Sequence, residues 1–386
     1  MRIKGLDGLR GIAFLMVFFF HTHWNQWGWP GVQLFFVLSG FLITGILMDM
    51  KENLPARPYF IKFYGRRILR IFPLYYFYLA IMWVLTTWAI SSGFETEPMF
   101  VYQNEMKYAL TYVYDFYFAL DNYIPSYFLT HFWTLAVEEQ FYLIWPLFIF
   151  LVPRKHMQKA FWIVIGAAPF LRLLILVLHG MDSFSFLRNN VALVVYSLPF
   201  THLDAFAFGA LLTLIRVPKA KGIFIASIII YPLLGLATDY LATGQWKDVT
   251  LASFGWPITM PYGNKFIWGY TIVNGLCAVL LYGVVRHGWA VRILEWPPLR
   301  YMGKISYGMY VYHLAIIWLI AKLFNLNIAN RFPLPLALFT FALVWVVAAL
   351  SFQWMEKPIM DLKDRFFDVP PERILQDPEP AAPTEA

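Results

Sequence analysis

An arginine and a histidine bracket the first apolar run of the chain, Arg10 at its start and His21 near its end. Because an α-helix advances 100° and about 1.5 Å per residue, both side chains lie on one face, ~16 Å apart along the axis. The cation lies near one membrane face and the imidazole well toward the other. A polar group at that depth needs a partner, water or a chemical role. The alternative is an N-terminal anchor with a snorkelling arginine and an interfacial histidine.

Two adjacent carboxylates, Glu138 and Glu139, lie within the fourth apolar run, where charged groups are costly. Helical neighbours point about 100° apart, so they cannot serve one atom equally. Glu138 shares a stripe with Thr134 and Tyr142. If this run enters the membrane from outside, Glu138 reaches a depth similar to that of His21. Depth then permits a Glu–His contact, which would orient the imidazole and raise its basicity. The alternative is a buried polar network that only fixes helix packing.

Two arginines, Arg67 and Arg70, lie three positions apart in the segment Tyr64–Pro73, hence on one helical face at a membrane boundary. Two guanidinium groups so placed form a fork-shaped anion site suited to phosphate. The alternative is ordinary basic charge that contacts lipid headgroups.

Four further polar positions lie within apolar runs. Ser39 precedes Gly40, and this pair is suited to close helix approach. Asp204 ends a polar patch that either binds an acceptor or caps and hydrates a helix end. Tyr310 and His313 continue a stripe that lines an acyl channel or forms a hydrogen-bonded packing seam. No cluster of His, Asp or Glu has metal-ligand spacing, so we expect no metal.

The composition determines the class of protein. Of 386 residues, 60% are hydrophobic, 20% aromatic and 14% charged, and the mean hydropathy is +0.58. A soluble domain could not cover so much apolar surface, which predicts an all-α polytopic membrane protein with about ten transmembrane helices. The predicted spans are roughly 9–24, 31–49, 71–92, 132–152, 160–178, 196–215, 222–241, 266–285, 304–324 and 333–354. We expect the single cysteine, Cys277, to be a small buried hydrophobe.

The basic residues predict the orientation. With both termini in the cytoplasm, and with Met106–Leu120 as an interfacial helix outside, most of the 30 Lys and Arg residues fall on the cytoplasmic side. The net charge of +7 is then an orientation signal, with contacts to membrane lipids, and we predict no nucleic-acid partner.

Several motifs of this chain together resemble the acyltransferase 3 family of integral membrane O-acyltransferases, in the family's order from near residue 5 to near residue 360. The matching segments are Leu6–Gly11 with His21, Gly31–Ile43, Arg67–Arg70, Trp133–Tyr142, Ile305–Gly308 with His313, and Glu356–Pro358.

The resemblance implies transfer of an acyl group, most often acetyl, from cytoplasmic acetyl-CoA to a hydroxyl of an extracytoplasmic sugar or lipid-linked glycan. It also implies a multi-pass protein of the bacterial inner (plasma) membrane, and it identifies Arg10 with His21 and Arg67 with Arg70 as the family's pairs. Gln33 stands where the family often has an acid.

These observations give one hypothesis for the site. Residues 1–360 form the membrane-embedded acyltransferase domain, and residues 361–386 a cytoplasmic tail, disordered from about 370. His21, Glu138 and Glu139 are the candidate catalytic residues. The candidate donor-binding residues are Arg10, Arg67 and Arg70, and the candidate substrate-binding residues are Ser39, Asp204, Tyr310 and His313. Direct transfer and a covalent acyl-histidine remain open. The alternative function is a glycolipid or acyl transporter or flippase without transfer chemistry.

Overall fold

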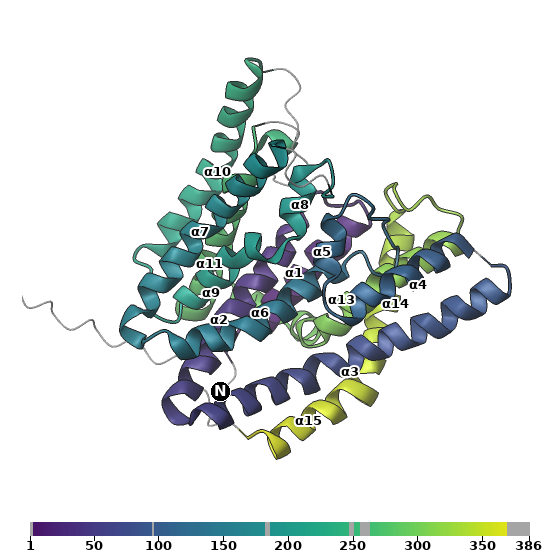
Figure 1. Ribbon diagram of the computed structural model, residues 1–386, viewed down its shortest axis with the longest axis horizontal. Coiled ribbons are helices and arrows are strands. Elements are labelled where there is room, and N and C mark those ends of the chain that lie inside the picture. Colours follow the sequence, from purple (N-terminus) through teal and green to yellow (C-terminus); the bar gives the residue numbers. More distant parts are fainter. Residues whose placement is uncertain (1–2, 95, 182–185, 247–250, 255–262, 369–386) are drawn as a thin grey trace, which may run out of the picture.

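The computed structural model describes residues 3–94, 96–181, 186–246, 251–254 and 263–368. Within these residues the regular secondary structure is helical, apart from one isolated antiparallel bridge between Leu120 and Leu187. The helices (Figure 1) are α1 (Leu6–His21), α2 (Pro30–Asn53), α3 (Ala56–Ser91), α4 (Thr96–Leu110), α5 (Tyr114–Ala119), α6 (Phe132–Leu151), α7 (Arg154–Gly180), α8 (Val191–Ser197), η1 (Pro199–His202), α9 (Leu203–Leu211), α10 (Ala220–Thr243), η2 (Leu251–Phe254), α11 (Phe266–His287), α12 (Val291–Leu294), α13 (Pro297–Leu323), α14 (Leu334–Ser351), η4 (Phe352–Glu356) and α15 (Lys357–Phe366).

Eight helices of the described residues are long and apolar enough to cross a membrane, and α8 with η1 and α9 would form a ninth span, bent by 75°. The bend follows from Pro199, because a residue that precedes proline is pushed into an extended conformation, as Leu198 is. The remaining predicted span is α1, whose 16 residues make it about 24 Å long, shorter than the ~30 Å hydrocarbon core. The prediction of an all-helical polytopic membrane protein is confirmed, whereas the orientation of the termini stays a prediction.

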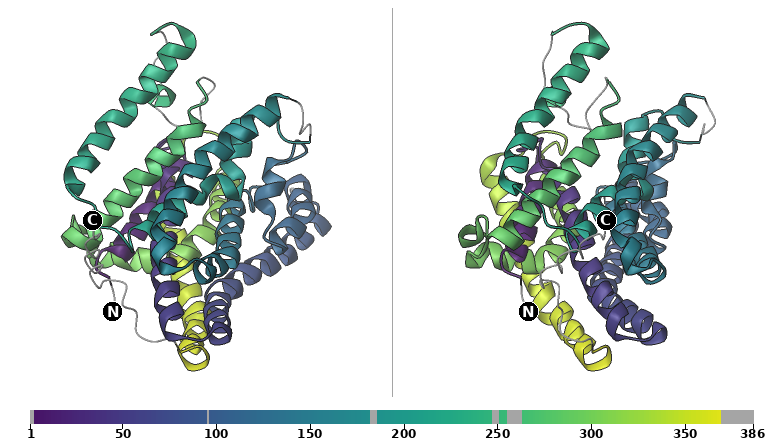
Figure 2. Two further views of the ribbon diagram at one scale, coloured as in Figure 1. Left: turned by 60° about the vertical axis from the view of Figure 1, so that its left-hand side comes forward. Right: turned by 90° about the vertical axis from the view of Figure 1, so that its left-hand side faces the viewer.

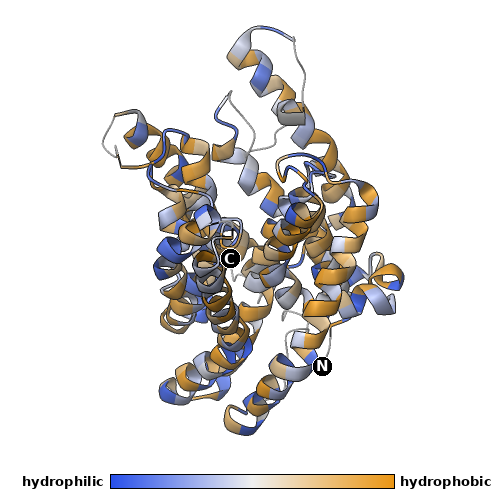
Figure 3. Ribbon diagram, turned by 90° about the vertical axis from the view of Figure 1, so that its right-hand side faces the viewer, coloured by the Kyte–Doolittle hydropathy of each residue, from blue (hydrophilic) through white to orange (hydrophobic). Residues whose placement is uncertain are grey.

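Apolar residues follow the lengths of the helices, and hydrophilic residues gather at helix ends and connections (Figure 3). Helix α10 is the least enclosed of the predicted spans, because only 17% of the residues in its most apolar 18-residue stretch are buried inside the protein. Figure 2 shows it extending beyond the other helices. An apolar helix with so little protein contact is suited to lipid surroundings.

Glycines bring the central helices close together. A Cβ on Gly303 of α13 would lie 1.6 Å from the main-chain oxygen of Asp7 in α1, and a Cβ on Gly40 of α2 would lie 2.1 Å from that of Phe206 in α9. Only glycine permits backbones to approach so closely inside a membrane bundle. These contacts hold α1 against α13 and α2 against α9, so that polar residues near them face a shared interior.

The segment predicted as one interfacial helix, Met106–Leu120, consists of the end of α4 and the whole of α5, with Tyr112 between them at φ 52°. The prediction of a single helix is therefore wrong. Neither helix is among those long enough to span. Glu105 in α4 is buried and accepts hydrogen bonds from the hydroxyls of Tyr114 (2.6 Å) and Tyr117 (3.3 Å). This carboxyl thus joins α4 to α5.

The carboxyl of Glu105 should make stability depend on pH. Burial raises its pKa from 4.5 to about 7, so between these values the folded protein holds a proton that the unfolded chain releases. The contribution of Glu105 to stability is therefore largest below about pH 4.5 and should fall by up to about 3 kcal/mol as pH rises through 7. We expect Glu105→Gln to flatten the dependence of the melting temperature on pH between 5 and 8.

The matched control is Glu97→Gln, which changes an exposed carboxyl of the same helix. This variant should keep the pH dependence of the wild type. Equal pH dependence in wild type and Glu105→Gln would contradict the assignment.

Helix α15 crosses the predicted domain boundary at residue 360 and lies along α3 (Figure 1). The main-chain oxygen of Phe367 accepts a hydrogen bond from Arg66 Nη1 (3.0 Å), and the ring of Phe367 packs against Gly65. The amphipathic helix thus belongs to the membrane domain. The predicted disorder from about residue 370 lies outside the described residues.

Candidate active site

A cavity of about 520 Å³ lies among α1, α2, α3, α6 and α13, with α15 at its edge. Its wall carries five basic side chains from three different helices: Arg10, Arg66, Arg67, Arg70 and Lys363. The three predicted donor-binding arginines are therefore brought together. Such a concentration of positive charge over a cavity attracts a polyanion.

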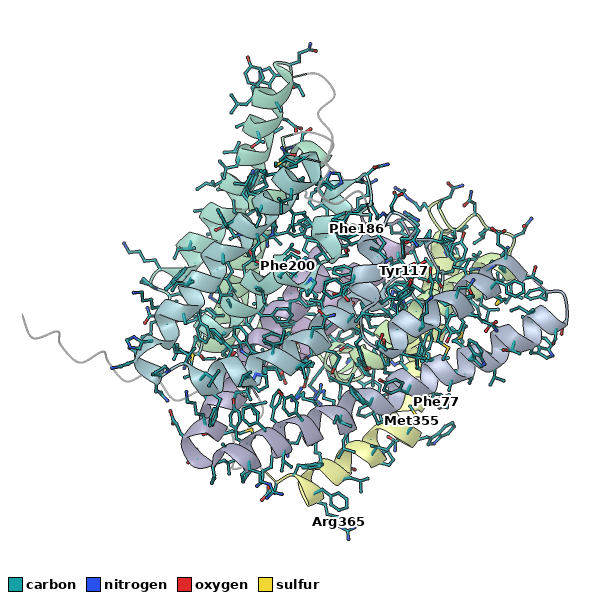
Figure 4. The ribbon with its side chains drawn as sticks, viewed as in Figure 1. Phe77, Tyr117, Phe186, Phe200, Met355 and Arg365 are labelled. Carbon is teal, nitrogen blue, oxygen red and sulfur yellow. The ribbon has the colours of Figure 1, made fainter. Side chains whose placement is uncertain are left out.

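Sequence reasoning missed two of these cations. Arg66 precedes Arg70 by four positions, and this helical spacing was an available signal. Lys363 lies beyond the predicted domain boundary, on α15, and only the packing of α15 on α3 brings it to the cavity. Two residues further on, Arg365 points away from the bundle (Figure 4), as expected for side chains about 200° apart on a helix.

Aromatic rings position the guanidinium of Arg67. It lies over the ring of Tyr142 (5.6 Å to the centroid) and over that of Phe63 (5.8 Å). Its Nε is buried without a hydrogen-bond partner among the described residues. Arg10 is held by Asp7, whose carboxylate oxygen lies 3.2 Å from the Arg10 Nη1. An unpartnered donor on a buried cation is suited to an incoming anion.

Both carboxylates of α6 line the cavity. Glu138 accepts hydrogen bonds from the hydroxyls of Ser39 and Tyr142, so the stripe predicted from helical spacing is present. Ser39 faces the cavity, while its neighbour Gly40 serves the close approach of α2 and α9. The hydroxyl groups hold Glu138 in place within the cavity wall.

The expected contact between Glu138 and His21 is not what the structure shows. His21 Nδ1 lies 3.0 Å from His313 Nε2. His313 Nδ1 in turn lies 2.5 Å from the main-chain oxygen of Tyr310, within its own helix. Similar depth stays a prediction, and depth alone does not decide which helix a side chain meets: α1 presents His21 to α13, with which it packs most extensively, rather than to α6.

A third histidine, His131, joins this group and was missed by sequence reasoning. Its ring centroid lies 4.8 Å from that of His313, and its Nε2 lies 3.2 Å from the main-chain oxygen of Val311. His131 immediately precedes α6, and its place just outside an apolar run gave no signal. His131 and His313 are buried, whereas His21 is half-buried.

The hydrogen bonds assign the tautomers of His313 and His21. A carbonyl oxygen only accepts, so His313 Nδ1 carries the proton that it donates to Tyr310. In the neutral ring, His313 Nε2 is then an acceptor, and it receives the proton of His21 Nδ1. This leaves His21 Nε2 with a free lone pair, which is the state that a general base needs.

Two hydroxyl groups separate the cavity from the histidines. The Thr134 Oγ1 and the Tyr310 hydroxyl lie 2.6 Å apart, and both side chains line the cavity. Both also lie within hydrogen-bond distance of the main-chain oxygen of His131, at 2.8 and 3.3 Å respectively. The cavity therefore ends against residues in direct contact with the histidine group.

Asp204 does not line the cavity. Both its carboxylate oxygens accept from Arg172 Nη2 (2.8 and 2.7 Å), and each accepts one further hydrogen bond, from Asn274 (3.0 Å) or Thr271 (2.6 Å). Asp204 and Arg172 are both completely buried. A carboxylate with so many donors has a structural explanation: it ties α9 to α7 and α11. We therefore withdraw the prediction that Asp204 binds a substrate.

Gln33, where the family often has an acid, is buried on α2 with its Nε2 3.3 Å from His202 Nδ1. This position thus faces His202 rather than His21. Within the described residues, no group of three or more His, Cys, Asp or Glu side chains is arranged to hold a metal ion.

Comparison with known sequences decides the family. The sequence profile of a family described as "Acyltransferase domain" matches residues 3–352. The chain belongs to this acyltransferase family. The resemblance predicted from the motifs is confirmed, since the match extends from the α1 motif to the start of η4.

Three curated relatives are similar over 92% of this chain. They are the peptidoglycan O-acetyltransferase OatA of Listeria monocytogenes (27% identical), the putative peptidoglycan O-acetyltransferase YrhL of Bacillus subtilis (29%) and the O-acetyltransferase OatA of Staphylococcus aureus (26%). The matched regions cover 56%, 55% and 57% of those proteins, so the chain spans about half the length of the curated relatives it matches. No solved structure matches.

Proposed function

We propose that this acyltransferase moves an acetyl group from cytoplasmic acetyl-CoA to a hydroxyl of an extracytoplasmic glycan, in a bacterial plasma membrane. The observation that carries the proposal is the cavity itself, which carries a basic cluster and is also lined by Thr134 and Tyr310. These two residues contact His131, and the main-chain oxygen of Tyr310 lies beside His313, the neighbour of His21. Two relatives are named as peptidoglycan O-acetyltransferases, one of them putatively, so we propose a cell-wall glycan as the acceptor.

The basic end is suited to the phosphates of coenzyme A. Arg10, Arg67 and Arg70 supply guanidinium groups from two helices, and forked guanidinium donors match phosphate oxygens. In this proposal Arg66 and Lys363 add to the positive potential. The pantetheine arm enters the cavity and carries the thioester toward Thr134 and Tyr310.

The transfer uses His21 as a base. His21 Nε2 takes the proton of the acceptor hydroxyl while the hydroxyl oxygen attacks the thioester carbon. The new C–O bond forms, the C–S bond breaks, and the proton passes to the sulfur of coenzyme A, which returns a neutral imidazole. A covalent route, in which His21 first accepts the acetyl group, uses the same residues.

The test is acetylation by the purified protein in detergent. Acetyl-CoA and a cell-wall glycan are supplied together, and free coenzyme A and acetylated glycan are measured. We expect both products in equal amounts, and neither in the presence of the glycan alone. Binding of acetyl-CoA without any product from a range of glycans would favour the transporter and contradict the transferase.

Lysine in place of Arg67 or Arg70 should weaken donor binding. Each variant keeps the positive charge, and thus the orientation signal, but loses the planar fork. Each lost charge-assisted contact costs about 1–3 kcal/mol, so the KM for acetyl-CoA should rise about tenfold or more. The KM for the acceptor should remain unchanged.

The matched control is Arg57→Lys, an exposed arginine of the same helix outside the cavity. If Arg67→Lys and Arg70→Lys both bind acetyl-CoA as tightly as this control, the arginines serve orientation and lipid contact instead.

A further inference from the structure

A second cavity, about 810 Å³ in volume, lies at the end of the bundle where α1 terminates. Three parts of the chain form it: Gly93 after α3 with the start of α4 (residues 96–101), residues 124–127 before α6, and the end of α13 with the segment that follows it (residues 318–328). We call it the outer groove. In Figure 1 the end of α3 that borders it lies at the right, away from the lower end of α15. Its volume is within the range of about 300–1,000 Å³ typical of small-ligand sites.

Hydrogen bonds fix the outer groove beside His21. Ile328 lines the groove, and its main-chain oxygen accepts from His23 Nε2 at 3.2 Å. The Phe332 amide donates to the main-chain oxygen of Thr22 at 3.2 Å. The residues directly after His21 are therefore bound to the segment that forms one wall of the groove.

The groove also approaches the histidines from α13. Trp318 lies five residues after His313 and lines the groove, and its ring centroid is 5.0 Å from that of Phe128. Phe128 precedes His131 by three residues. The wall of the outer groove thus continues into α13, which carries His313, and into the segment before α6 that carries His131.

The lining is close to neutral, and it includes two aromatic side chains, Tyr127 and Trp318. Among its described residues, one acidic and one basic side chain are present, Glu97 and Lys322, in contrast to the five cations of the first cavity. Tyr127 is 42% exposed, and Trp318 is 7% exposed. The Trp318 Nε1 is buried without a hydrogen-bond partner among the described residues. A buried, unpaired indole N–H is costly unless a ligand supplies an acceptor.

This chemistry matches a neutral carbohydrate. Sugar hydroxyl oxygens accept from an indole N–H, and the C–H faces of sugar rings pack on tyrosine and tryptophan rings, which combine an apolar body with a polar tip. A phosphorylated ligand would need a cluster of basic residues such as the one at the first cavity. We propose that the outer groove binds the oligosaccharide of the acceptor, with Trp318 and Tyr127 as its contacts. This inference rests on the proposed function.

Binding of chitopentaose, a neutral N-acetylhexosamine oligosaccharide, tests the groove directly. Binding is measured by calorimetry on the purified full chain without acetyl-CoA. Trp318→Phe keeps the ring that packs on Phe128 but removes the N–H, and Tyr127→Ala removes an exposed ring whose loss leaves the core intact. Each should weaken binding about fivefold to tenfold. Tyr240→Ala, which removes an equally exposed tyrosine from α10, should bind as wild type does.

Kinetics then separate this proposal from the transferase. Both groove variants should raise the KM for the glycan and leave acetyl-CoA binding and kcat as in wild type. Undiminished chitopentaose binding by both variants overturns the groove assignment. Absence of chitopentaose binding by the wild type also overturns it. If the groove variants then still lose transfer to an acceptor that is carried on a protein, the groove docks a protein. Failure of acetyl-CoA binding and turnover in the wild type contradicts the proposed function, whereas the sugar measurement reports on the groove alone.

Discussion

Replacing His21 by alanine should lower the kcat for acyl transfer by about 10²- to 10⁴-fold, the usual contribution of a general base. The imidazole is the group whose Nε2 the hydrogen bonds leave free to take a proton. Affinity for acetyl-CoA should stay as in the wild type, because Arg67 and Arg70 lie on α3, at the basic end of the cavity. The membrane insertion of the variant should also be unchanged.

The measurements are product formation, acetyl-CoA binding and the melting temperature. His156→Ala, which alters an exposed histidine on α7, is the control and should be fully active. Wild-type product levels from His21→Ala would refute the catalytic assignment. Radiolabelled acetyl-CoA without an acceptor then separates the two routes, because label trapped on His21 in the wild type requires the covalent one.

The sequence is sufficient to predict the membrane-spanning helices and the side chains that share one helical face. Apolar runs of membrane-spanning length determine the helices, and the spacing within each run determines which side chains share a face. That is why Arg67 and Arg70 were paired correctly, and why Glu138 was placed on one stripe with Tyr142. Both inferences require only the geometry of one helix.

The partner of His21 could not be predicted in the same way. Depth along a helix gives a position across the membrane, but it does not give the rotation of that helix or its neighbour in the bundle. Those depend on glycine contacts such as Gly303 against α1, which join segments almost 300 residues apart in the sequence. For the actual neighbour, His313, the sequence predicts a substrate channel or a packing seam, and neither prediction pairs it with His21.

For Asp204 the sequence predicts a functional role, whereas the structure shows a structural one. An acid within an apolar run indicates function by default because its cost is high. Arg172, on another helix 32 residues earlier, satisfies it completely. Two isolated charges in two apolar runs were visible in the sequence, but nothing in their spacing showed that the two helices meet.

His313 should act as a positioning residue, through His21. Its Nε2 accepts the Nδ1 proton of His21, at 3.0 Å, and thereby keeps the lone pair on the nitrogen that faces away. The variant His313→Leu removes this acceptor and places an apolar side chain at the same position. Loss of the group that sets the tautomer of a catalytic imidazole lowers kcat by orders of magnitude, so we expect His313→Leu to lose about 10²-fold or more. Glutamine carries an amide oxygen that accepts a hydrogen bond, and His313→Gln should recover part of the activity.

The pH profile distinguishes positioning from packing. In His313→Leu the Nδ1–H of His21 has lost its acceptor on α13, so the acidic limb of the kcat/KM profile should shift relative to the wild type, and in His313→Gln it should return toward the wild-type position. Acetyl-CoA binding should be equal in all three proteins, because His313 lies outside the lining of the cavity. If the leucine and glutamine variants lose activity equally and keep the wild-type pH profile, His313 only fills space between α1 and α13, and another group sets the tautomer of His21.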